Sequence, residues 1–373
     1  MQIVLAPDSF KGSITSIRAS ETMAEAITSI DPSIQTIIKP MADGGEGTLE
    51  ALLKATTGVS VPFFCRGPLG EASESFFAEI DNQTAVIECA TIAGLPLVPL
   101  GQRNPDVTTT YGIGEAILRA MDRGNKHLII GLGGSSTNDG GLGMLQALGM
   151  KAFNADAEKV GIFGKDLLEI EAVDFGGMDP RLMEVTIQVA CDVDNPLTGS
   201  NGATYVYGPQ KGATNDQLQV YDQALSRYGQ LIEKACNHSL ANVKGAGAAG
   251  GLGFALLAIG AKLQSGAKLV ADAIKLEEAI KVADLVITGE GQSDEQTLYG
   301  KAPGYVAELA AVHHKPTILL SGSLDGNVDK LNDVFAGCFS IVPGSRTLQQ
   351  CMDNGELYLY NATKQLIHLI RKL

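Results

Sequence analysis

The sequence predicts an α/β protein of two domains, and three observations lead to this prediction. Short apolar strands alternate with helical segments at both ends of the chain, which is the pattern of a parallel sheet. Several of these strands run into loops rich in glycine, aspartate and serine that open the next helix. The length of 373 residues exceeds one ordinary domain, so we expect two hydrophobic cores.

The two ends of the chain show the clearest alternation. Residues 1–58 predict a strand, an amphipathic helix near 15–30, a strand at 34–40 and a helix at 47–55. The pattern resumes with strands near 285–288, 317–320 and 339–342 and with helices near 304–314 and 358–373. One face of the last helix is marked at helical spacing by Leu366, Ile367, Ile370 and Leu373. These segments predict one α/β domain with a parallel sheet.

The middle of the chain has a different organisation. The segments VSVPFFCRGP, ESFFAEI and QTAVIEC follow one another with short turns, which indicates antiparallel pairing. We therefore expect a discontinuous α/β domain formed by 1–63 and 285–373. A mixed α/β domain, 64–284, is inserted into it.

Charge and composition favour small-molecule partners. The formal net charge is −14 at pH 7, and no cluster of lysine and arginine is longer than two residues. These features argue against a nucleic-acid partner and against an anionic membrane surface. Six cysteines without CxxC spacing indicate buried thiols in a reducing compartment, and we expect a cytoplasmic protein. The uncharged stretch between Lys244 and Lys262 is mostly glycine and alanine, so it predicts a buried helix.

Several familiar motifs are absent or lack their usual context. The segment GAGAAG at 245–250 matches the dinucleotide fingerprint, but polar residues and no predicted strand precede it. The chain has no Walker A loop, no protein-kinase signature and no nucleophile elbow. Its five histidines lie outside the Gly/Asp-rich loops. A histidine base is therefore not expected.

The loops themselves contain carboxylates, amides, hydroxyls and lysines. This inventory suits phosphoryl transfer, in which positioning, Mg²⁺ and charge neutralisation do most of the work. Turn formation and helix capping alone would explain Asp, Asn and Ser in any one loop, but they require neither a lysine nor paired glycines. The side chains come from five loops: Asp8, Ser9, Lys11; Asp43, Glu46; Ser135, Ser136, Thr137, Asn138, Asp139; Asp192, Asp194, Asn195; Glu290, Asp294.

The ordered motifs resemble those of one enzyme family. They are APDSFKGS (6–13), PMADGGEGT (40–48), GLGGSSTNDGG (131–141), CDVDNPLTG (191–199), GPQKGA (208–213), GAGAAGGLG (245–253) and GEGQSDEQT followed by GKAP (289–303). Together they are similar to the type 1 glycerate kinases of bacteria, from the first strand to the last helix. The resemblance implies transfer of the γ-phosphoryl group of ATP to D-glycerate, giving 2-phosphoglycerate, with Mg²⁺ required. It also implies a flavodoxin-like domain interrupted by an inserted domain, with the active site in the cleft between them.

Roles for individual residues follow from this resemblance as hypotheses. Asp192, at the end of the apolar strand IQVAC, is expected to be desolvated and to accept the hydroxyl proton, with Asp8 and Lys11 as further catalytic residues. Lys11, Lys301 or Lys211 would hold the glycerate carboxylate. Candidate metal ligands are Asp43, Glu46 and Asp139. The predicted substrate and phosphate contacts are Ser9, Gly44, Gly45, Gly133, Gly134, Ser135, Ser136, Asn138, Asn195, Lys211, Gly247, Asp294 and Lys301.

Three other functions stay open at this point. A kinase of another small hydroxy acid or sugar acid would carry the same loops, because the sequence does not define pocket size. A sensor that had kept the cleft and lost the chemistry is a second alternative. An NAD-dependent oxidoreductase of the same acid is the third, and it depends on GAGAAG alone.

Overall fold

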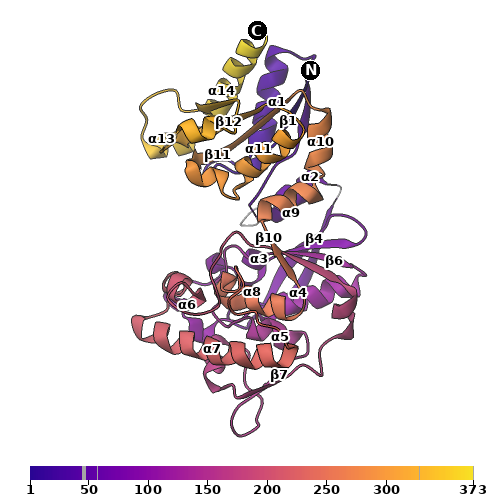
Figure 1. Cartoon of the computed structure of the whole chain (residues 1–373), viewed down its shortest axis with the longest axis vertical. Coiled ribbons are helices and arrows are strands. Elements are labelled where there is room, and N and C mark those ends of the chain that lie inside the picture. The colour runs from indigo at the N-terminus through magenta and orange to yellow at the C-terminus, as the bar shows by residue number, and fades with distance from the viewer. Residues whose placement is uncertain (44–47, 57, 327, 373) are drawn as a thin grey trace. The chain divides into compact units, whose positions relative to one another are not determined.

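The computed structural model describes residues 1–43, 48–56, 58–326 and 328–372 (Figure 1). The chain forms two compact units, each described here by itself. Unit 1 comprises 1–43, 50–56 and 265–373, and unit 2 comprises 44–49 and 57–264. An α/β chain with an interrupted first unit is thus observed. The boundaries at 63/64 and 284/285, and a site between the domains, stay predictions.

Unit 1 is built on a five-stranded parallel sheet with the order β13-β12-β11-β1-β2. When these five strands are numbered 1 to 5 along the chain and read from the β2 edge, the order is 2-1-3-4-5. This is the flavodoxin-like order implied by the resemblance. Its strands are β1 (Gln2–Leu5), β2 (Gln35–Ile38), β11 (Leu285–Ser293), β12 (Thr317–Leu324) and β13 (Gly337–Ser340). The predicted strands at 285–288 and 317–320 are present, but both extend further, because Gln292 and Ser293 pair with Ser323 and Leu324.

Helices cover both faces of this sheet. On one face α1 (Ser16–Ile30) packs beside α14 (Gly355–Ile370) over alternate strand residues such as Ile3, Ile287 and Leu320. On the other face Ala307 of α11 (Ala302–Val312) packs with Leu319 and Leu331. The unit also contains α9 (Gly266–Ala273), α10 (Leu276–Val282), the 3₁₀ helix η7 (Glu295–Leu298), α12 (Val328–Asn332) and α13 (Leu348–Asp353). Helix α2 (Thr48–Ala55) begins in unit 2 and continues in unit 1.

Unit 2 contains a six-stranded mixed sheet with the order β10-β9-β6-β5-β4-β3. Its strands are β3 (Val59–Arg66), β4 (Ala72–Glu79), β5 (Thr84–Glu88), β6 (His127–Gly131), β9 (Thr186–Ala190) and β10 (Lys262–Gln264). The antiparallel pairing predicted for the first three of them is confirmed, and the others are parallel. A small antiparallel pair is formed by β7 (Lys151–Phe153) and β8 (Ala172–Asp174).

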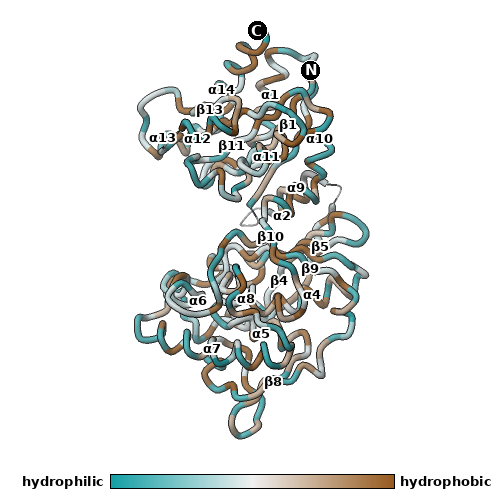
Figure 2. Tube along the Cα trace, viewed as in Figure 1, coloured by the Kyte–Doolittle hydropathy of each residue, from teal (hydrophilic) through white to brown (hydrophobic). Residues whose placement is uncertain are grey.

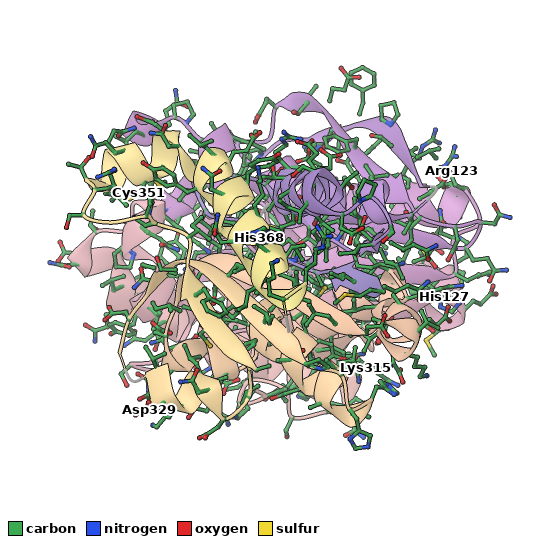
Figure 3. All side chains as sticks on the ribbon, turned by 90° about the horizontal axis from the view of Figure 1, so that it is seen from above. Arg123, His127, Lys315, Asp329, Cys351 and His368 are labelled. Atoms are coloured by element: carbon green, nitrogen blue, oxygen red, sulfur yellow. The ribbon has the colours of Figure 1, made fainter. Side chains whose placement is uncertain are left out.

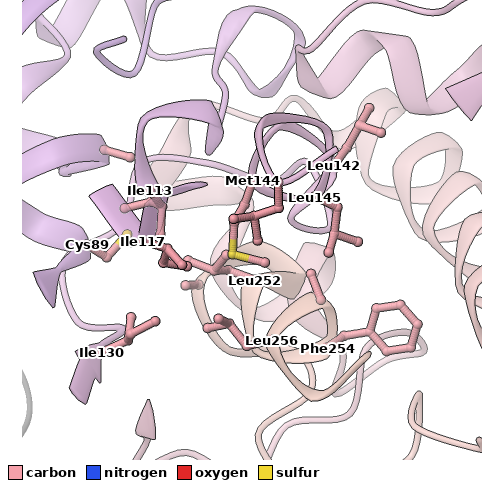
Figure 4. Close-up of a cluster of buried hydrophobic side chains, with 14 of the residues drawn as sticks. Cys89, Ile113, Ile117, Ile130, Leu142, Met144, Leu145, Leu252, Phe254 and Leu256 are labelled. Atoms are coloured by element: carbon pink, nitrogen blue, oxygen red, sulfur yellow. The ribbon is translucent and has the colours of Figure 1, made fainter. Parts of the chain in front are cut away.

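The helices of unit 2 enclose one large hydrophobic core. They are α3 (Cys89–Ala93), α4 (Tyr111–Asp122), α5 (Leu142–Ala147), α6 (Ala203–Tyr207), α7 (Asn215–Cys236) and α8 (Ala248–Ala258). Side chains of α4, α5 and α8, including Ile117, Met144 and Leu252, meet in this core (Figure 4). The apolar strands stand out against the polar loops along the chain trace (Figure 2). Helix α8 is buried, as predicted. None of the described helices has both the length and the hydropathy to cross a membrane.

Candidate active site

The loop after β1 places Asp8 at the carboxyl edge of the unit 1 sheet. The backbone N–H of Asp8 donates to the carbonyl of Gly289 at 2.8 Å, which ties this loop to the neighbouring strand β11. The hydroxyl of Ser13 donates to the carbonyl of Met352 at 2.6 Å. Gly12 has a φ of +77°, and a Cβ there would lie 2.6 Å from Cε of Met352. The loop is therefore fixed at both ends, with Asp8, Ser9 and Lys11 between them.

Asp8 is a buried carboxyl group, 7 % exposed. Burial, together with the charge of Asp43, raises the pKa of Asp8 to about 7. The backbone N–H of Ser9 donates to Oδ1 of Asp8 at 2.6 Å and partly offsets this effect. An acidic group with a pKa near neutrality can accept a proton and return it, which is the property of a general base.

Lys11 and Asp43 form an ion pair beside Asp8. Nζ of Lys11 lies 3.1 Å from Oδ2 of Asp43, and the charge of Asp43 raises the pKa of Lys11. The side chain of Lys11 is 77 % exposed, so its ammonium group is accessible to an anion. This pair brings together a predicted catalytic residue and a predicted metal ligand.

Strand β11 adds a second buried carboxylate, Glu290. Its Oε1 accepts hydrogen bonds from the hydroxyls of Ser293 at 3.0 Å and Thr297 at 2.7 Å. Its Oε2 lies 3.7 Å from Nζ of Lys301, which also lies 4.0 Å from Oδ1 of Asp294. Burial raises the pKa of Glu290. Glu290 belongs to the loop inventory from the sequence, but its position beside Asp8 was not predicted.

These groups line one pocket of about 840 Å³ that belongs entirely to unit 1. It lies outside the carboxyl ends of β1 and β11, where the strand order reverses direction, and open α/β sheets bind ligands at such a switch point. Six residues predicted from the sequence meet in it: Asp8, Ser9, Lys11, Asp43, Asp294 and Lys301. Met352 and Tyr358 also line it and were not predicted, because they come from helices near the C-terminus.

In unit 2 the loop after β6 is organised around Asp139. This carboxylate is fully buried, and its oxygens accept hydrogen bonds from the N–H and hydroxyl of Thr110 and from the N–H groups of Gly141 and Gly143, at 2.7–3.3 Å. Burial raises the pKa of Asp139. The predicted phosphate loop 133–138 immediately precedes Asp139 in the chain. The hydrogen bonds of Asp139 therefore fix the backbone at the end of this loop.

Lys211 is held beneath the same loop. Its ammonium group donates to Oγ of Ser135 at 2.8 Å and to the carbonyl of Thr137 at 2.7 Å. The residue is 2 % exposed, and burial lowers the pKa of Lys211 to about 8. Asn138 donates from Nδ2 to Oγ1 of Thr204 at 3.0 Å. Gly133 is half-buried and Gly134 is exposed, whereas Ser135 and Ser136 are buried.

The loop that contains Gly247 and Gly250 contacts this one and also contacts the loop of Asn195. The carbonyl of Gly250 accepts from the N–H of Gly140 at 2.9 Å, and the N–H of Gly247 donates to the carbonyl of Asn195 at 2.9 Å. Positive φ angles at Ala249, Gly250 and Gly251 interrupt the start of α8. No strand immediately precedes α8 in the described chain, since α7 does, so GAGAAG lacks the strand that a dinucleotide fingerprint requires.

The structure corrects the physical reason given for Asp192. Strand β9 ends at Ala190, and Asp192 is exposed, so the burial that was expected to increase its basicity is absent. Predicted residues Gly44, Gly45 and Glu46 lie outside the described residues, as does Leu373. Among the described residues, no group of three or more His, Cys, Asp and Glu side chains converges as a metal site.

Comparison with known proteins assigns the chain to a protein family. The model of the glycerate kinase family matches residues 3–371. The chain belongs to this family. It is 44 % identical over 375 residues to a glycerate kinase of Bacillus subtilis (strain 168), covering 100 % of this chain and 98 % of that protein. It is 45 % identical over 353 residues to a glycerate 2-kinase of Escherichia coli (strain K12), covering 94 % and 93 %.

A solved structure agrees with the family assignment. The crystal structure of a Salmonella typhimurium LT2 protein assigned as glycerate kinase 2 has a TM-score of 0.91 and 41 % identity, covering 100 % of this chain and 98 % of that one. The fold and the family thus point to the same class of protein. The chain is an enzyme of the kinase class that acts on small molecules, and ATP is the cosubstrate that a kinase family implies.

Proposed function

We propose that this enzyme transfers the γ-phosphoryl group of ATP to the 2-hydroxyl of D-glycerate, forming 2-phosphoglycerate and ADP. The family and the Escherichia coli relative named glycerate 2-kinase support this substrate and this position. The observation that carries the proposal is the buried carboxyl of Asp8, which lines the unit 1 pocket together with the Lys11–Asp43 pair and Glu290.

We assign the general base to Asp8. In the reaction the 2-hydroxyl proton of glycerate passes to the Asp8 carboxylate while the hydroxyl oxygen bonds to the γ-phosphorus. The bond from that phosphorus to the bridging oxygen breaks, and its electron pair leaves with ADP. A pKa of about 7 lets Asp8 be ionised before the step and hold the proton after it. Asp192, the general base predicted from the sequence, is the alternative to Asp8.

The cations of the pocket would bind the phosphate groups. Lys11 is exposed toward the pocket, and Lys301 lies between two carboxylates without closing a short ion pair to either. Both can turn their ammonium groups to an incoming anion. Charge neutralisation by such groups stabilises the transferring phosphoryl group.

The carboxylates of the pocket fit Mg²⁺. The negative charges of Asp43 and Glu290 both raise the pKa of Asp8, so three carboxyl groups face one region. Mg²⁺ is commonly bound by one or two carboxylates together with substrate phosphates. Asp43 and Glu290 would supply these carboxylates. Bound there, Mg²⁺ would supply positive charge that neutralises the phosphate groups of the nucleotide. Asp139, a metal ligand in the sequence prediction, already accepts four hydrogen bonds, two from Thr110 and one each from the N–H groups of Gly141 and Gly143.

Unit 2 offers a second anion site at Lys211. We assign the glycerate carboxylate to this lysine, whose buried ammonium group donates to the hydroxyl of Ser135 and to the carbonyl of Thr137. The chain has few cations relative to its 42 acidic residues, so a buried lysine without an acidic partner at hydrogen-bond distance among the described residues is suited to an anionic substrate.

The test is an assay of ADP release from MgATP with D-glycerate, with enolase added to detect the product. Enolase dehydrates 2-phosphoglycerate but not 3-phosphoglycerate, so dehydration without a mutase supports the proposal. ADP release whose product reaches enolase only through a mutase would place the phosphoryl group on the other hydroxyl. Turnover only with another hydroxy acid in a parallel panel would remove D-glycerate as the substrate.

A further inference from the structure

The unit 1 pocket changes in character along its length. The sheet order places the ends of β1, β11, β12 and β13 side by side in that sequence. The carboxylates and lysines described above follow β1 and β2 or lie in and after β11. The side chains at and beyond the ends of β12 and β13 and on α13 and α14 are mainly apolar, with three serines, Ser323, Ser340 and Ser345, among them. The apolar side chains are Leu324, Ile341, Val342, Leu348, Met352 and Tyr358. Cys351 marks α13 in Figure 3.

The apolar end is suited to a flat, uncharged ring. Ile341 is buried, and Met352, Val342 and Tyr358 are half-buried, so they present fixed apolar surface to the pocket. The only charged lining residue that follows β12 among the described residues is Arg346, whose guanidinium donates to the carbonyl of Ser345. A guanidinium group stacks on aromatic rings, whereas an acidic side chain would repel a phosphorylated ligand.

The dimensions of the pocket exceed those of glycerate. Four strand ends span three inter-strand spacings, roughly 14 Å in all. The volume of about 840 Å³ lies within the range of sites for ligands much larger than a three-carbon acid. An extended nucleoside triphosphate has a length comparable with this row of strand ends. Its apolar ring and anionic tail match the apolar and charged ends of the pocket.

We propose that the apolar end of this pocket binds the adenine ring of ATP, while the triphosphate extends along the strand ends toward Lys11 and Lys301. This inference rests on the proposed function and locates its nucleotide. Close approach of the nucleotide is helped by Gly291 and Gly322, which lie at the strand ends between the two regions and line the pocket.

The chain contains no tryptophan, so a single introduced tryptophan is a specific reporter. Leu348 and Leu357 provide a matched pair, because both lie in the first turn of a helix of unit 1 and are 77 % and 55 % exposed. Only Leu348 lines the pocket. We expect the fluorescence of Leu348→Trp to change saturably with ADP and to stay constant with D-glycerate. The fluorescence of Leu357→Trp should respond to neither.

The affinity for ADP of variants at the same two positions provides a second readout. Leu348→Gln should raise the Kd for ADP, measured by calorimetry, about five- to tenfold, corresponding to the loss of one apolar contact. Leu357→Gln should leave it unchanged, and neither variant should change the KM for D-glycerate. A reporter at Leu348 that stays silent while calorimetry shows ADP bound, or one that responds to D-glycerate instead, would overturn the inference. Failure of the proposed function is a separate outcome, seen as ADP binding at Leu348 without turnover of D-glycerate.

Discussion

At the scale of single residues, Asp8 links activity to stability. Its pKa of about 7 in the folded protein exceeds its ordinary value of 3.8, so between these values the folded state binds more protons than the unfolded state. The contribution of Asp8 to stability is therefore greatest at low pH and is lost as the pH rises through about 7. Burial of this carboxyl, the proposed general base, therefore costs stability near neutrality.

Replacement of Asp8 by asparagine removes this cost. We expect the free energy of unfolding of Asp8→Asn to exceed that of the wild type at pH 8. The advantage should grow by on the order of 2 kcal/mol between pH 5 and pH 8. Denaturant titrations at the two pH values measure it. An advantage that is the same at both pH values would show that Asp8 does not ionise near neutrality.

Lys211 links substrate binding to pH. Burial lowers its pKa to about 8, so the ammonium group is charged below this pH and neutral above it. The KM for D-glycerate should therefore rise as the pH increases through about 8. Lys211→Met should raise the KM at pH 7 at least tenfold and abolish this dependence. Lys244→Met, at an exposed lysine of the same unit, is the control and should behave as the wild type. A pH dependence that survives Lys211→Met would contradict this role.

At the scale of elements, the loop between β6 and α5 depends on one carboxylate. Asp139→Ala leaves the donors of Thr110, Gly141 and Gly143 without their buried acceptor, so we expect a loss of about 3 kcal/mol or more in unfolding free energy. Asp156→Ala, at an exposed turn of unit 2, should cost little. Unfolding measurements compare the two. Unchanged stability of Asp139→Ala with a raised Mg²⁺ requirement would favour the metal-ligand role predicted from the sequence.

Elements whose signal is local could be predicted from the sequence. The antiparallel order of β3, β4 and β5 follows from short turns between apolar runs, and α8 follows from an uncharged Gly/Ala stretch. The extension of β11 and β12 through GEGQS and SGSL could not be predicted in the same way. There the two strands pair with each other at residues that, apart from Leu324, are polar or glycine, so the pairing depends on the neighbouring strand.

At the scale of the whole molecule, the chemistry of the site was easier to predict than its position. Lysines and carboxylates in the Gly-rich loops identified Asp8, Lys11 and Lys301 as site residues, and the structure places them in one pocket. The basicity of a carboxylate depends on burial, which is a tertiary property. For this reason Asp192, which follows an apolar strand, was expected to be desolvated and is exposed, whereas Asp8 is buried.

Asp8 and Asp192 are rival bases, and their variants test the central claim most directly. Removing a general base lowers kcat by about 10²- to 10⁴-fold, because the attacking hydroxyl must then lose its proton without help. The measurement is kcat of Asp8→Asn and Asp192→Asn with saturating MgATP and D-glycerate, together with the pH profile of the wild type. We predict a loss of this size for Asp8→Asn, a small change for Asp192→Asn, and a wild-type rate that falls as the pH decreases through about 7. Near-normal turnover of Asp8→Asn with a large loss in Asp192→Asn would contradict this account.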